Sequence, residues 1–142
     1  FWVRGMIHVA ESKEAARYEA SGYAVNAAYL MWTLMSTKGP DAEDLRKRLI
    51  KEIPTIVEDC KKVYENFDPA YMEHPDSPAA KYITPAMLDT MHVVGTPEQV
   101  CEQLKRIEDA GFKTFGTVTY TIKDKREMMQ RIAAEVMPHF KQ

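Results

Sequence analysis

The last third of the chain, residues 91–142, constrains the fold more than any other part. It reads as a short apolar strand at 91–95, a helix that begins at Thr96, a second strand at 114–120 and a final helix. Two parallel strands need a crossover connection, and a helix is the usual one. We therefore expect a βαβα unit, of the kind that builds α/β barrels and doubly wound sheets.

The joints of this unit carry physical signals. Thr96 and Gln99 match the T-x-x-Q capping box, with Pro97 at the first helical position. Gly111 supplies the left-handed residue that often ends a helix. One face of the intervening helix carries the apolar residues Val100, Leu104 and Ile107. The run 114–120 is rich in β-branched and aromatic residues and has no charge, which predicts a strand covered on both faces.

The first half of the chain is predicted to be mostly helical. A strand at residues 2–9 leads to Ser12, which can cap a long helix that ends near Ser36. Small residues make up much of the packing face of this helix, so a neighbouring helix or strand can approach closely, although Gly22 in mid-helix costs about 1 kcal/mol relative to Ala. Pro54 predicts a kink or restart in the following helices. The face expected to pack is made of Ala16, Ala20, Tyr23, Ala27, Leu30 and Leu34.

Length and element count place limits on the architecture. The 142 residues contain three predicted strands, at 2–9, 91–95 and 114–120, and five or six helices, so we expect a single α/β domain spanning 1–142. Three parallel strands cannot close a barrel, and an open sheet leaves two edges unpaired. Since the chain begins without Met and already in a strand, we expect either a longer parent chain or two copies that associate.

Composition excludes several classes of function. A net charge of −2 lacks the excess of basic residues expected of a nucleic-acid-binding protein, so nucleic acid is not an expected partner. The sequence has no apolar run of membrane-spanning length and no signal-peptide pattern, so we expect a soluble, cytoplasmic protein with no membrane partner. The four histidines lack the spacing of a metal site, and no metal is predicted. Cys60 and Cys101 fall on predicted helices and are expected to be buried free thiols.

The motifs of the chain resemble those of a known family. The GTPEQV helix start at 95–100, the EDAGFKTF segment at 108–115 and the EVMPHF segment at 135–140 resemble the final two βα units of the luciferase-like monooxygenases. That superfamily includes flavin-dependent monooxygenases and coenzyme F420-dependent methylenetetrahydromethanopterin reductases. The strand before Ser12-Lys13-Glu14-Ala15-Ala16 also resembles the sixth-strand region of the family.

This resemblance implies a partial (β/α)8 TIM barrel, with the chain as the C-terminal βα units of a flavin- or F420-dependent oxidoreductase. The chain would complete the barrel and one side of a pocket for a small-molecule substrate. FMN or coenzyme F420 would be the cofactor of the parent protein. Most cofactor contacts of the family lie on earlier strands, so we expect the chain alone to be inactive and to bind little or no cofactor.

The barrel rule directs attention to side chains after the C-terminal ends of the strands. The candidates for cofactor or substrate binding are His8, Thr96, Thr119 and Tyr120. Tyr120 can hydrogen-bond a ligand or line a ring, and Thr96 is either a helix cap or part of an anion site at the helix N-terminus. No catalytic residue of the family maps onto this chain. The alternative is a non-enzymatic small α/β module that forms a homo-oligomer through its sheet edge or its helix face.

Overall fold

The computed structural model describes residues 2–71, 73–118 and 124–140. The chain divides into two compact units, which we treat separately: a sheet unit of residues 1–20 and 89–142, and a helical unit of residues 21–88. The elements, in chain order, are β1 (Trp2–Val9), α1 (Lys13–Met35), α2 (Pro40–Glu52), α3 (Ile56–Glu65), η1 (Pro69–Tyr71), η2 (Ala80–Tyr82), α4 (Pro85–Met91), β2 (Val93–Gly95), α5 (Pro97–Asp109), β3 (Thr114–Val118), α6 (Lys125–Glu135) and η3 (Met137–Phe140).

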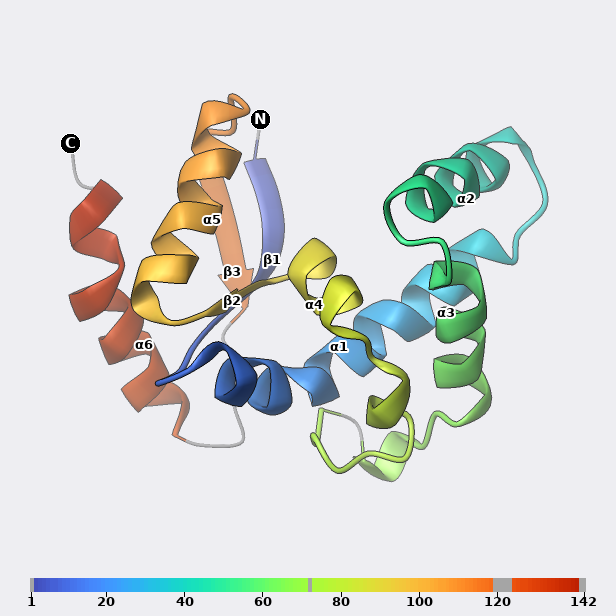
Figure 1. Cartoon of the computed structure of the whole chain (residues 1–142), viewed down its shortest axis with the longest axis horizontal. Coiled ribbons are helices and arrows are strands. Elements are labelled where there is room, and N and C mark those ends of the chain that lie inside the picture. The colour runs from blue at the N-terminus through green and yellow to red at the C-terminus, as the bar shows by residue number, and fades with distance from the viewer. Residues whose placement is uncertain (1, 72, 119–123, 141–142) are drawn as a thin grey trace. The chain divides into compact units, whose positions relative to one another are not determined.

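The sheet of the sheet unit consists of three parallel strands (Figure 1). β1 pairs with β2 in the register Ile7 to Val93, and with β3 in the register Trp2 to Thr114. The parallel α/β arrangement, with six α-helices among the described residues, confirms the predicted fold class. The predicted strand at 114–120 is described to Val118, and its last two residues lie outside the described part of the chain.

The order of the strands differs from the simplest barrel expectation. In a closed (β/α)8 barrel each strand lies beside the strands before and after it in the chain. Here the order is β2-β1-β3, so β1 lies between its two successors, as in the first strands of some doubly wound sheets. The lengths of the strands give a physical reason for this order. β2 has three residues, whereas β1 has eight and can pair with β3 at five positions.

The helix α5 begins and ends as its sequence predicts. The Thr96 side chain accepts a hydrogen bond from the Gln99 backbone, and the Gln99 side chain accepts one from the Thr96 backbone, which completes the capping box. At the other end, Gly111 has a φ of 94° and its N–H donates to the Glu108 carbonyl. The crossover between β2 and β3 is thus determined by local sequence.

The core of the sheet unit lies between the strands β1 and β2 and the helices α5 and α6. Alternate residues of a strand point to opposite faces, so Ile7 and Val9 share one face of β1. They are buried with Val100 of α5 and Ile132 of α6. The prediction that β3 is covered on both faces was wrong, because β3 is an edge strand and its Thr114 and Thr117 are exposed.

The helical unit is built around the second part of α1. Helix α2 ends at Glu52 and α3 begins at Ile56, which confirms the predicted restart at Pro54. Tyr29 of α1 stacks on Tyr64 of α3 with ring centroids 5.0 Å apart. At Gly22 the loop backbone of residues 73–74 lies so close that no Cβ fits.

The buried face of α1 differs from the predicted one. Ala24, Val25 and Ala28 are fully or almost fully buried, whereas Leu30 is 60% and Leu34 56% exposed. The four-three alternation of the sequence did identify one continuous helical face, but its C-terminal part points to solvent. A hydrophobic period of 3.6 residues identifies the faces of a helix, but it does not determine which face packs against the rest of the protein.

Candidate functional site

Two of the four predicted site residues, His8 and Thr96, lie at the C-terminal ends of the neighbouring strands β1 and β2. His8 pairs with Val94 and Val9 with Gly95 in the parallel register, and the Ala10 N–H donates to the Gly95 carbonyl at 3.1 Å. His8 and Thr96 therefore lie at the same edge of the sheet. The other two candidates, Thr119 and Tyr120, lie outside the described residues.

His8 is the most buried polar group at this edge. Because side chains alternate along a strand, His8 and Met6 point to the face opposite the core shared by Ile7 and Val9. The His8 side chain has no exposed area, and its Nε2 lies 2.9 Å from Oε2 of Glu19, whose side chain is 9% exposed. The first turns of α1 thus cover this face of β1.

Glu19 is a polar partner that the sequence analysis did not identify. It lies in α1, after Ser12, whose hydroxyl accepts from the Ala15 N–H at 3.1 Å and so fixes where the helix starts. That start sets which residues of α1 face the strand. A helix capped at Ser12 and a buried strand histidine four residues earlier were together the available signal for this contact.

Thr96 acts as a helix cap in this structure. Its hydroxyl accepts from the Gln99 N–H and donates to the Glu98 carboxylate at 2.8 Å. The pKa of Glu98 is lowered by its own backbone N–H and by the Thr96 hydroxyl. A carboxylate therefore already occupies the N-terminal end of α5. Gly95, with a φ of 155°, has the Gln99 Oε1 only 2.6 Å from where a Cβ would lie, so this turn is closely packed.

Glu11 links the loop after β1 to α6. Its carboxylate lies 2.8 Å from Nη1 of Arg131, which also contacts Glu135 at 3.0 Å. The Glu11 side chain is 87% exposed, so the pair is solvated and contributes about 1 kcal/mol at most. The pair is too exposed to form a closed polar site.

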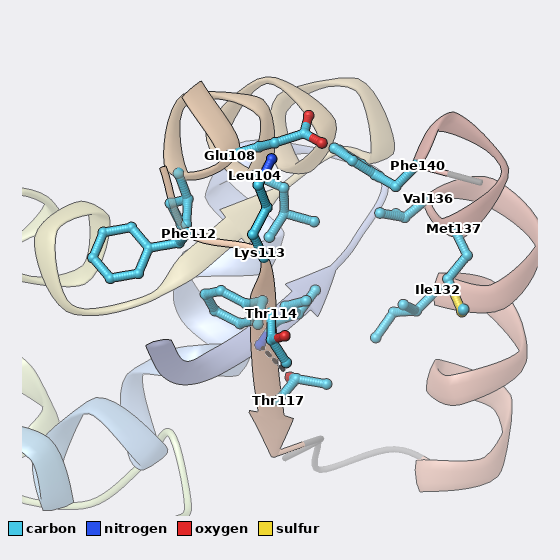
Figure 2. Close-up of a pocket in the computed structure, with 13 residues that line it drawn as sticks. Leu104, Glu108, Phe112, Lys113, Thr114, Thr117, Ile132, Val136, Met137 and Phe140 are labelled. Atoms are coloured by element: carbon cyan, nitrogen blue, oxygen red, sulfur yellow. Dashed lines mark hydrogen bonds between the residues drawn. The ribbon is translucent and has the colours of Figure 1, made fainter. Parts of the chain in front are cut away.

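A separate groove lies on the other face of β1, between α5, β3 and α6 (Figure 2). It has a volume of about 420 Å³ and includes Leu104 and Ile107 of α5, Phe115 of β3 and Ile132 of α6 in its lining. Its ionisable lining residues are Glu108 and Lys113. Neither His8 nor Thr96 is among its described lining residues, most of which offer apolar packing surface.

Metal and thiol chemistry find little support in the described part of the chain. Among these residues no group of three His, Cys, Asp or Glu side chains could hold a metal ion. Burial raises the pKa of the Cys60 thiol to about 12, and it also raises that of Cys101, which is half-buried. Both thiols are therefore protonated near neutral pH and are poor nucleophiles. No helix in the described residues has the length and apolar character to cross a membrane.

Parallel strands joined by crossover helices define the fold of this chain as α/β. The coenzyme F420-dependent tetrahydromethanopterin reductase from Methanopyrus kandleri has a similar structure, with a TM-score of 0.69 and 16% sequence identity. The similar region covers 99% of this chain and 35% of the reductase. The resemblance found in the sequence is thereby confirmed at the level of the fold.

Comparison of the amino-acid sequence identifies no relative, whereas comparison of the structure does. No family model and no curated protein sequence matches the chain. At 16% identity the structural likeness establishes the fold. The chain spans about a third of the reductase, so the activity and ligands of the whole enzyme do not transfer directly to it.

Proposed function

We propose that this chain is the C-terminal segment of a luciferase-like, flavin- or F420-dependent oxidoreductase, in which it completes the barrel and one side of the substrate pocket. The observation that carries the proposal is the structural match of 99% of the chain to one part of an F420-dependent reductase. Independent support comes from the sequence motifs at 95–100 and 108–115, which resemble the same superfamily.

The described residues do not by themselves form a site for FMN or F420. Both cofactors carry phosphate, for which a helix N-terminus is a common binding site. At α5 that position is taken by Glu98 and by the capping box of Thr96. His8 is enclosed against Glu19. A cofactor would therefore rely on the remaining strands of a parent barrel, and this chain would contribute one wall.

A cofactor titration tests the proposal. We expect the chain alone to leave the fluorescence anisotropy of F420 and of FMN nearly unchanged. The in-frame coding sequence upstream of Phe1 should encode further βα units, and the extended protein should bind one of the two cofactors stoichiometrically. Tight binding by the chain alone, or a start codon directly before Phe1, would contradict the proposal.

Self-association is the second candidate function, and the exposed part of α1 favours it. Leu30 and Leu34 are each more than half exposed on one face of the helix. From Glu19 to Lys38 the intervening sequence carries no charged residue, so two copies of this face would not repel each other. A second copy of the chain, packed antiparallel along α1, is the partner that fits this face.

Light scattering after size exclusion tests the second candidate. We expect the chain to be a dimer and Leu30→Glu/Leu34→Glu to be a monomer, because two carboxylates would be buried in the interface. Ile50→Glu on α2, where the wild-type side chain is 42% exposed, is the matched control and should leave the dimer intact. A monomeric wild-type chain would refute this candidate.

A further inference from the structure

The groove between α5, β3 and α6 has mostly apolar walls that are open to solvent (Figure 2). Leu104 of α5 lies on one side, and Ile132 and Val136 of α6 lie on the other. Two further lining residues, Phe112 and Met137, are 36% and 51% exposed. Contiguous exposed apolar surface commonly marks a binding groove. The volume of about 420 Å³ lies within the range of about 300–1,000 Å³ that is usual for small-molecule sites.

The floor of the groove consists of side chains from β1 and β3. Ile7 of β1 belongs to the buried core, and Phe115 of β3 packs against that core. The Phe115 ring lies over Gly5 of β1, where an added Cβ would be 3.1 Å from the ring. The absence of a side chain at Gly5 therefore leaves room for the ring. A ligand would meet this apolar floor already formed, which lowers the cost of ordering side chains on binding.

The ionisable side chains of the groove lie at the end where α5 leads into β3 (Figure 2). Glu108 is in the last turn of α5, and Lys113 directly precedes β3. The Glu108 carboxylate lies 2.7 Å from Nζ of Lys105, which is also 3.2 Å from the Asp109 carboxylate. Among the residues that the structure describes, Lys113 makes no ion pair. Its ammonium group, which carries three hydrogen-bond donors, is therefore available beside the apolar walls.

We propose that this groove binds a small amphipathic acid, with its hydrocarbon chain between α5 and α6 and its carboxylate beside Lys113. The walls suit the chain, because burial of apolar surface is favourable in proportion to its area. The ammonium suits the head group, and Lys105 balances the charge of Glu108. An exposed ion pair adds little affinity, but it selects the sign of the head group. The inference does not depend on the proposed function, since the groove is separate from the strand ends that carry His8 and Thr96.

Titration of the chain with three eight-carbon probes, octanoate, 1-octanol and octylammonium, tests the proposal. ¹H–¹⁵N NMR spectra of the labelled chain report both where each probe binds and how tightly. We expect octanoate to shift the signals of Leu104, Phe115 and Ile132 and to bind about threefold more tightly than 1-octanol. Octylammonium should bind most weakly. The expected ratio is small because Lys113 is exposed and solvent screens its charge.

Substitutions at exposed positions separate the charge of Lys113 from the rest of the groove without threatening the fold. Lys113→Gln should bind octanoate no more tightly than 1-octanol. Arg126→Gln on α6 is the matched control, because Arg126 is exposed and is not among the described lining residues, and it should retain the preference for octanoate. Met137→Glu should weaken octanoate binding, because it adds a negative charge to the lining.

Three outcomes would overturn the proposal. The first is that octanoate causes no shifts in the groove up to its solubility limit. The second is that the shifts centre on Leu30 and Leu34 of α1. The third is that the three probes bind equally, or that Lys113→Gln keeps the preference for octanoate. Because these titrations need no cofactor, their failure is distinct from failure of the F420 and FMN titration.

Discussion

Gly22→Ala is expected to destabilise the helical unit by about 3 kcal/mol or more, because a methyl group at this position overlaps rigid backbone. A Cβ at Gly22 would lie 2.5 Å from the carbonyl carbon of His74 and closer still to the carbonyl group of Glu73. Neither group is the end of a flexible side chain, so relief requires the loop to move. Chemical denaturation followed by circular dichroism measures the change.

The sign of this effect is informative, since helix propensity alone predicts the opposite. Ala within a helix is favoured over Gly by about 1 kcal/mol. Thr33→Ala in the same helix is the matched control, because Thr33 is exposed and its hydroxyl donates to the carbonyl of Tyr29 one turn earlier. We expect a change within about 0.5 kcal/mol for the control. A Gly22→Ala chain as stable as the wild type would show that the loop does not lie against α1.

The stability of the sheet unit is expected to fall as the pH drops from about 6.5 towards 4. Burial lowers the pKa of His92 from 6.5 to about 4, so the folded ring stays neutral while the unfolded ring takes up a proton. The unfolded state therefore binds more protons in this window, and stability is lost on acidification. The loss reaches about 2 kcal/mol at pH 5 and about 3 kcal/mol at lower pH.

Unfolding free energies measured at several pH values separate this effect from the carboxylates. The wild type minus His92→Gln difference isolates the histidine, and the window from pH 5 to 6.5 lies above the range in which Asp and Glu normally titrate. His139→Gln is the control, because His139 is exposed in the same unit. It should follow the wild-type pH profile. An unchanged pH profile in His92→Gln would show that His92 is not enclosed as the structure has it.

The parts of the fold that were predictable depend on neighbours in sequence. The capping box of Thr96 and Gln99, the helix end at Gly111 and the break at Pro54 each involve residues within one or two turns. Strong local signals of this kind need no tertiary context. The sheet order is different, since it depends on whether β3 pairs with β1 or with β2. β1 ends at Val9 and β2 at Gly95, whereas β3 begins only at Thr114, so neither pairing is local in sequence.

The candidate site divides in the same way. His8 and Thr96 were predictable as neighbours at one edge of the sheet, because the sequence indicates two parallel strands and the residue at which each ends. The partner of His8 does not follow, because contact between a strand and a helix depends on the rotation of α1 about its axis. The same rotation decides that Leu30 and Leu34 face solvent, although their spacing matched a packing face.

The amino-acid sequence by itself determined the parallel α/β character of this protein, the ends of its main helices and its resemblance to the luciferase-like superfamily. The tertiary structure decided the strand order, the pairing of His8 with Glu19 and the enclosure of Gly22 by a loop. The physical reason is that caps and turns are satisfied by atoms a few residues away. Pairing of distant strands, helix rotation and burial are settled only when the whole chain packs.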